Sequence, residues 1–133
     1  MVRHRRPSGE SERGSAPAEF ALVAGLLALL TLSVLQLALA LHVRNTALDA
    51  AAEGARIAAL ADSGLAEGEQ RTRDLLVTAL SAGYARQVDA AYRDVEGTRT
   101  VEVTVVFPLP VLGLVGFERG LEVRGHAAVE AVD

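Results

Sequence analysis

A long uncharged apolar run constrains this chain more than any other feature. Residues 20–41 read FALVAGLLALLTLSVLQLALAL and contain no charged side chain. As an α-helix rising about 1.5 Å per residue, the run spans roughly 33 Å, which suits the ~30 Å hydrocarbon core of a bilayer. The sequence therefore predicts a transmembrane helix near the N-terminus.

The polar members of this run are Thr31, Ser33 and Gln36. The hydroxyls of Thr31 and Ser33 can donate to carbonyls of their own helix. The amide of Gln36 is harder to satisfy in this way. Two interpretations stay open: Gln36 faces another helix, or a single Gln is tolerated in one span.

The flanks of the run predict its orientation, because basic residues favour the cytoplasmic side. Arg44 is the first charged residue after the run, and Asp49 and Glu53 follow it. Before the run lie Arg3, Arg5, Arg6 and Arg13. We therefore expect a single-pass protein of the cell membrane, with a cytoplasmic N-terminus and residues 62–133 outside the cytoplasm.

The helical pattern continues beyond the apolar run, to about Leu60. Small and apolar residues recur there at three- and four-residue steps, among them Ala51, Ala55 and Ala58. Small residues let helices approach closely. The pattern predicts one helix over residues 15–61 whose Ala-rich face packs against neighbouring helices.

A cleavable secretory signal is an alternative interpretation of the same region. Ala38-Leu39-Ala40 fits the small-residue cleavage triplet of such signals. The apolar run is, however, longer than the roughly 7–15 residues that they contain. Cleavage after Ala40 would release a soluble binding protein that begins at Leu41.

A different processing pattern precedes the run. Gly14 follows a basic leader, and Glu19 lies five residues further on, directly before Phe20 opens the apolar stretch. This pattern resembles the type IV prepilin signal, which a membrane-embedded aspartic peptidase cuts after the Gly. The resemblance implies a cytoplasmic leader over residues 1–14, a cut between Gly14 and Ser15, and a hallmark acid at Glu19.

A carboxylate at the edge of a bilayer is costly unless it is paired. In an assembly, the new amine of Ser15 in one subunit can pair with Glu19 of its neighbour and set the axial register, a use of buried charge pairs that is well attested. The alternative interpretation is an acid of the first helical turn, favoured by the helix dipole and solvated by headgroups.

Two motifs narrow the resemblance to the TadE-like family of the Flp/Tad pilus system. Glu19-Phe20 lies in the stretch AEFALV, and residues 52–56 read AEGAR. The strand that leads to Pro108 and the closing strand are similar too, so the resemblance covers nearly the whole chain after Arg13. Pro17 departs from the family pattern, although Pro is acceptable near a helix start.

This resemblance implies a minor pilin-like component that a prepilin peptidase processes. Its implied partners are the membrane, other pilin-like subunits and the pilus assembly machinery. An alternative is an unprocessed single-pass membrane anchor that tethers an extracytoplasmic adaptor domain of another envelope assembly.

Residues 62–133 predict a small α+β domain of pilin-like architecture. We expect Gly64 to cap the end of the long helix, and a second helix over residues 66–81 with an apolar stripe of Leu75, Leu76, Ala79 and Leu80. A turn is expected at Glu96-Gly97-Thr98. About three antiparallel strands are expected at residues 87–95, 100–107 and 121–132. The apolar residues 111–120 either tuck under the sheet or contact the outer leaflet or a partner subunit.

Nothing in the sequence indicates catalysis. The chain has no Cys, and His4, His42 and His126 lack partners at metal-ligand spacing. No phosphate-binding loop, dinucleotide-binding motif or nucleophile elbow is present. The net charge of −4 gives no argument for nucleic acid. We therefore expect no enzyme activity, cofactor, metal or small-molecule substrate.

Overall fold

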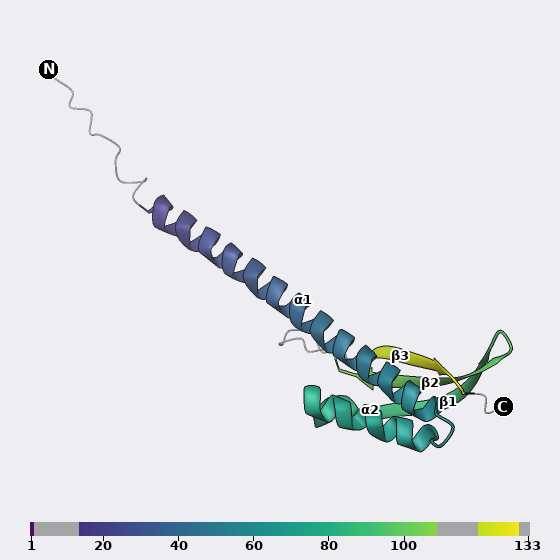
Figure 1. The fold of residues 1–133 in the computed structure, drawn as a ribbon. Coiled ribbons are helices and arrows are strands. Elements are labelled where there is room, and N and C mark those ends of the chain that lie inside the picture. The colour runs from purple at the N-terminus through teal and green to yellow at the C-terminus, as the bar shows by residue number, and fades with distance from the viewer. Residues whose placement is uncertain (2–13, 109–119, 131–133) are drawn as a thin grey trace. The chain divides into compact units, whose positions relative to one another are not determined.

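The computed structural model describes residues 1, 14–108 and 120–130 and is an α+β structure (Figure 1). Its described elements are the helices α1 (Ser15–Ala59) and α2 (Leu65–Ala79), the 3-10 helix η1 (Ala82–Ala85), and the strands β1 (Gln87–Val95), β2 (Thr98–Phe107) and β3 (Leu121–Ala128). The predicted fold class is thereby confirmed. The chain divides into two compact units, Met1–Leu37 and Ala38–Asp133, and α1 contributes to both.

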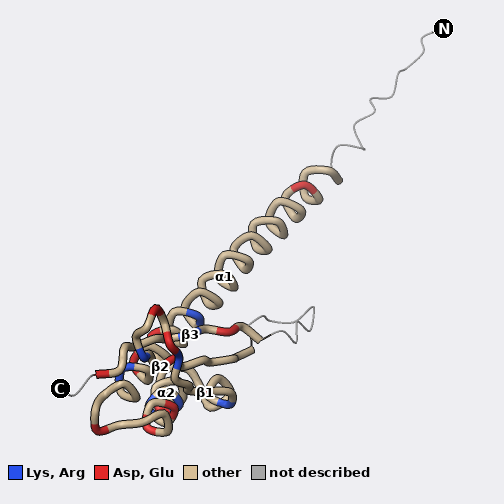
Figure 2. The backbone as a smooth tube through the Cα atoms, turned by 90° about the vertical axis from the view of Figure 1, so that its right-hand side faces the viewer, with Lys and Arg blue, Asp and Glu red and all other residues tan. Residues whose placement is uncertain are grey.

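The part of α1 in the first unit carries most of the apolar run, and the most apolar 18-residue window of the helix has no buried residue. By length and composition, α1 is the helix among the described residues that suits a membrane span. Figure 2 shows no charged residue between the acid near the start of α1 and the second unit. The hydroxyls of Thr31 and Ser33 donate to the carbonyls of Leu27 and Leu29, each at 2.8 Å, as predicted.

The end of α1 differs from the expectation in one respect. The helix stops at Ala59, close to the predicted end, but Gly64 does not cap it. Gly64 has an extended backbone, with φ −146°, and is the N-cap of α2. Its N–H donates to Glu67 Oε2 at 3.0 Å. The predicted C-terminal cap was therefore wrong, because such a cap requires a left-handed residue.

The strands form one antiparallel sheet in the order β1-β2-β3. β1 and β2 are joined by a two-residue turn in which Glu96 and Gly97 both have positive φ, at 53° and 80°. Such turns match the twist of the flanking strands, so Val95 pairs directly with Thr98. β2 consequently starts earlier than predicted.

β3 ends at Ala128 rather than at residue 132. Beyond it, the N–H of Glu130 donates to the carbonyl of Ala59 at 3.1 Å. The last carbonyls of a helix lack partners within the helix, and this bond supplies one from the chain that follows β3. Residues 109–119, which include most of the predicted apolar loop, lie outside the described residues.

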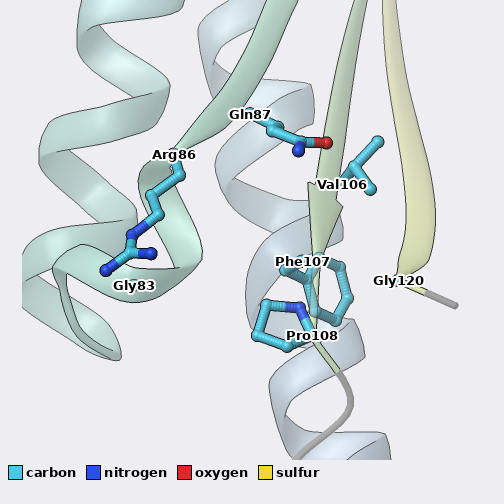
Figure 3. A pocket seen from close by; sticks show the side chains of 7 residues that line it. All are labelled: Gly83, Arg86, Gln87, Val106, Phe107, Pro108 and Gly120. Carbon is cyan, nitrogen blue, oxygen red and sulfur yellow. The ribbon is translucent and has the colours of Figure 1, made fainter. Parts of the chain in front are cut away.

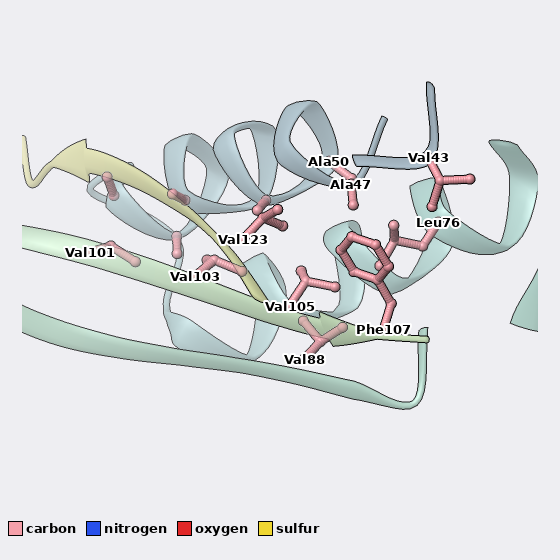
Figure 4. Packing of buried hydrophobic residues seen from close by; sticks show 14 residues of the cluster. Val43, Ala47, Ala50, Leu76, Val88, Val101, Val103, Val105, Phe107 and Val123 are labelled. Atoms are coloured by element: carbon pink, nitrogen blue, oxygen red, sulfur yellow. The ribbon is translucent and has the colours of Figure 1, made fainter. Parts of the chain in front are cut away.

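The core lies between the inward face of the sheet and the two α-helices (Figure 4). The predicted alternation in β2 is confirmed, since the apolar residues of its inward face are at most 1% exposed: Val101, Val103, Val105 and Phe107. From α2, Leu76 is fully buried, whereas Ala79 is exposed and the helix ends there. The predicted stripe on α2 is therefore narrower than expected.

Candidate functional site

The predicted processing segment lies at the start of α1. Gly14 precedes the helix, and Ser15 is its first residue. The first turn contains no acid, because Glu19 is already the fifth helical residue. Since helix-dipole effects fade within the first turn, the interpretation of Glu19 as a first-turn acid was wrong. Ser15 and Glu19 are four residues apart and so share one face of the helix.

The two residues predicted to serve subunit register and recognition are both accessible. Glu19 is exposed, and Phe20 has 75% of its surface exposed. Gln36 lies further along the same unit and is half-buried. The roles of these residues between subunits stay predictions, and so does the cut between Gly14 and Ser15.

The predicted helix-packing alanines lie in the second unit, where α1 meets α2. Ala51 and Ala55 are fully buried, and Ala58 is 2% exposed. Two glycines face each other at this crossing: a Cβ built on Gly54 would lie 2.6 Å from the carbonyl oxygen of Gly68, and a Cβ on Gly68 would lie 2.6 Å from that of Gly54. Glycines at this crossing let the two backbones touch.

A second close approach joins α1 to the sheet. A Cβ on Gly125 of β3 would lie 2.3 Å from both the carbonyl carbon of Ala51 and the nitrogen of Ala52. The buried Thr72 adds a polar link between the helices, because its hydroxyl lies 2.9 Å from the carbonyl of Gly68 and 3.3 Å from that of Ala50. α1 is thus held between the backbones of α2 and β3.

These contacts give the Ala-rich face a partner within the chain. The sequence predicted that this face packs against neighbouring helices of an oligomer, whereas in the structure α2 and the sheet of the same chain cover it. Because Ala51, Ala55 and Ala58 are covered by the chain's own α2 and sheet, this face is not available to a second subunit while the domain is folded.

The outward face of the sheet carries a charge cluster that sequence reasoning missed. Glu102 accepts hydrogen bonds from His126 Nε2 at 2.9 Å and from Arg93 Nε at 3.4 Å. The bond from His126 lowers the pKa of Glu102, and nearby Arg124 and Arg93 lower it further, whereas desolvation acts in the opposite direction. The feature that brings this cluster together is the register of β2 and β3, which places Glu102 opposite His126.

A shallow pocket of about 310 Å³ opens at one end of the sheet (Figure 3). Its lining residues are Gly83, Arg86, Gln87, Val106, Phe107, Pro108 and Gly120. Arg86 is its one ionisable side chain, so this lining offers no pair of groups for acid–base or nucleophilic chemistry. Among the described residues, no group of three or more His, Asp or Glu side chains is placed to hold a metal ion.

The segment that contains most of α1 matches a known protein family. Residues 14–56 match the model of the family described as TadE-like protein. Over this segment, the chain is similar to TadE-like proteins. The resemblance expected from AEFALV and AEGAR is confirmed, since both lie inside the match. No curated protein and no solved structure gives a significant match.

The extent of the TadE-like match agrees with the geometry of α1. It begins at Gly14, directly before the helix, and ends at Arg56, just after the crossing at Gly54. It covers about a third of the chain and does not reach α2 or the sheet, so the strand features of the expected resemblance are not part of it. Within the AEGAR motif, Gly54 contacts α2, whereas Arg56 is exposed and pairs with Glu53 at 3.7 Å.

Proposed function

We propose that this TadE-like protein is a minor pilin or pseudopilin of a Flp/Tad pilus system, processed by a prepilin peptidase between Gly14 and Ser15. The match to TadE-like proteins suggests a pilin-like protein related to the Tad pilus, and pilin-like proteins are generally not enzymes. The observation that carries the finer proposal is the coincidence of three boundaries: the family match begins at Gly14, α1 begins at Ser15, and the apolar run begins at Phe20.

The position of Gly14 suits a processing site. The residue is exposed outside the helix, and a Cβ built on it would meet nothing within 4 Å. A peptidase can therefore reach the bond to Ser15 without unwinding α1. After the cut, the new α-amine would lie at the positive end of the helix dipole, where a cation is unfavourable.

Glu19 would offset that cost. It lies about 6 Å further along the helix axis, on the same face as Ser15. A neighbouring subunit displaced by this distance would bring its own Glu19 level with the amine. Pairing between subunits would then neutralise both charges at the bilayer edge and fix the axial register.

The rest of α1 would anchor and carry the soluble domain. We propose that residues 20–41 span the cell membrane once, with the N-terminus in the cytoplasm and the domain outside. The basic leader supports this orientation through the positive-inside rule. The partners would be the peptidase, other pilin-like subunits and the assembly machinery.

The test is the N-terminal residue of the protein recovered from membranes of cells that contain the native peptidase. We expect a chain that starts at Ser15. A start at Met1 would contradict processing and leave an unprocessed anchor for an adaptor domain. A start at Leu41 would contradict the membrane span as well, and would indicate an exported soluble protein.

A matched pair of glycine variants makes this test sharper. A Cβ on either Gly14 or Gly25 would meet nothing within 4 Å, so Val is tolerated sterically at both positions. Gly14→Val should leave the leader attached, whereas Gly25→Val should be processed normally. Equal processing of the two variants would refute the proposed cleavage site.

A further inference from the structure

The sheet has two edge strands, β1 and β3 (Figure 1), and the chain treats them differently. Along β1, Arg73 Nη2 donates to the carbonyl of Val88 at 2.8 Å, and Glu69 Oε1 accepts from the N–H of Ala90 at 3.0 Å. These two side chains of α2 also pair with each other at 3.2 Å. An open strand edge is a template for pairing with another chain. The side chains of α2 therefore close the half of the β1 edge at which the strand begins.

The free edge of β3 follows from the strand register. The N–H of Val129 donates to the carbonyl of Arg99 at 2.9 Å, which extends the ladder of β2 and β3 by one position. Backbone groups of successive residues point to opposite sides of a strand, so the odd-numbered residues of β3 bond β2. The N–H and C=O groups of Glu122, Arg124 and His126 consequently point away from β2. No group in the described part of the chain bonds them.

The strand β3 lacks several features that keep an edge from pairing, such as Pro, a bulge or a charge that points inward. It contains no Pro and pairs with β2 without interruption over all eight of its residues. The residues of its inward face carry no charge: Leu121, Val123, Gly125 and Ala127. An added strand would therefore continue the sheet in a regular register.

An added strand would also cover apolar surface on α1. A Cβ on Gly125 would lie 2.3 Å from the nitrogen of Ala52, so this part of α1 underlies β3. α2 contacts α1 at Gly54, which lies about 200° around the helix from Ala52. Leu48 and Ala52 are four residues apart and so share the flank of α1 that is away from α2. Both are only half-buried, and apolar side chains of an added strand would bury them.

We propose that the free edge of β3 binds an extended segment of a partner protein, which adds an antiparallel strand to the sheet. Main-chain hydrogen bonds give such binding its affinity, and alternate side chains give it specificity. Glu122 and Arg124 are exposed on the outward face of β3. The segment that fits this edge carries a basic residue opposite Glu122 and an acidic residue opposite Arg124. Its intervening residues are apolar and cover Leu48 and Ala52. This surface adds a protein partner and does not rest on the proposed processing or membrane span.

A second copy of this chain fits the edge less well than a single extended segment. Gly125 approaches the backbone of α1, so each copy would bring a helix beneath its own β3. Paired strands are about 4.8 Å apart, whereas packed helices need about 8–10 Å between their axes. Pairing two β3 strands would therefore crowd the two helices against each other, which an isolated strand does not do.

Two variants at one position test the edge from the side of the protein. Arg124→Pro removes an N–H from the free edge, where Pro is tolerated because that N–H does not bond β2. Arg124→Ala removes the same side chain and keeps the N–H. The probe is a fluorescein-labelled synthetic peptide in which Val alternates with Thr, Glu and Lys, ordered so that Glu faces Arg124 and Lys faces Glu122. It is titrated into the full chain in detergent, and binding is followed by fluorescence anisotropy.

We expect Arg124→Ala to weaken binding of the peptide by at most about fivefold, because it removes only a charge pair. Arg124→Pro should weaken it by at least about tenfold, because a buried main-chain acceptor of the peptide loses its partner. Equal urea unfolding midpoints of the two variants would show that both are folded. Equal affinities of two folded variants, or no binding by the native chain, would overturn the proposal.

A second measurement uses the native chain and so does not depend on any variant that must fold. Two versions of the peptide each carry one N-methyl group, either on an amide that faces β3 or on the neighbouring amide that faces away. The first should lose binding, and the second should bind within about twofold of the unmodified peptide, because only the first amide belongs to the ladder. Equal effects of the two methyl groups would refute strand addition. Self-association of the native chain that Arg124→Pro abolishes would assign the edge to a second copy and also overturn the proposal.

Discussion

The contact between Gly125 and α1 predicts a large loss of stability from the smallest possible side chain. In Gly125→Ala, the new Cβ would lie 2.3 Å from backbone atoms of Ala51 and Ala52. Carbon atoms at their optimal separation are about 3.5–4.0 Å apart, so β3 and α1 must separate by at least about 1 Å. No side chain can rotate away, because the atoms that are met belong to a helix backbone.

The magnitude follows from what that separation disrupts. Overpacking a core costs about 1–3 kcal/mol, and a gap approaching 1 Å forfeits up to about half of the dispersion energy of the contacts it opens. We therefore expect Gly125→Ala to lower the free energy of unfolding by about 2–4 kcal/mol. For a domain of this size, that corresponds to a melting temperature lower by roughly 10–25 °C.

Urea unfolding of the full chain in detergent, followed by Tyr fluorescence, measures this loss. Both Tyr residues, Tyr84 and Tyr92, lie in the second unit, so the signal reports on the domain and not on the span. Gly83→Ala is the matched control, because its Cβ would meet only Ser81 Oγ at an ordinary 3.7 Å. Equal unfolding midpoints for the two variants would show that β3 does not rest on α1 as described.

Three further predictions concern side chains. Thr72→Val should destabilise the domain by about 1–2 kcal/mol, because it leaves the buried carbonyl of Ala50 without its hydroxyl partner; Thr72→Ser keeps the hydroxyl and should recover most of the loss in the same urea assay. The pKa of Glu102 is lower in the folded state than its ordinary value of 4.5, so the ionised side chain stabilises the fold at pH values above 4.5. That contribution is lost as the pH falls through the lowered pKa. Unfolding midpoints between pH 6 and pH 3 should therefore fall more for the native chain than for Glu102→Gln; parallel curves would contradict the pairing with His126. Glu19→Gln should be processed but fail to assemble into pili, as judged by electron microscopy of surface filaments, and normal assembly would refute its role in register.

The local patterns in the sequence predicted most of the second unit. Val101, Val103 and Val105 alternate strictly, and this pattern is enough to indicate a strand with one buried face. The Ala positions on α1 likewise indicated a packed helix face. Local pattern reports that a face is buried, however, and not what covers it. The elements that cover this face are α2 and β3, which approach α1 closely at Gly68 and Gly125. Those close approaches join residues that are far apart in the sequence, so local pattern does not reveal them.

The role of Gly64 and the pairing of Glu102 with His126 were missed because both depend on backbone conformation or strand register. Gly64 is compatible with either end of a helix, and only the backbone angle shows that it begins α2. Glu102 and His126 are ordinary surface residues until the register of β2 and β3 places them opposite each other. At the start of α1, by contrast, Gly14 and Glu19 could be singled out from sequence, because their meaning depends on spacing along one helix.

The packing of α1 between the backbones of α2 and β3 also has a consequence for the order of events during synthesis. Ala51 emerges from the ribosome long before Gly125, which covers it in the folded domain. Until β3 has been made, the small-residue face of α1 has only part of its cover, and the domain cannot complete its core. The apolar run can meanwhile enter a membrane, because none of its hydrophobic window is buried by the domain. Entry of the apolar run into a membrane therefore need not wait for the domain to fold.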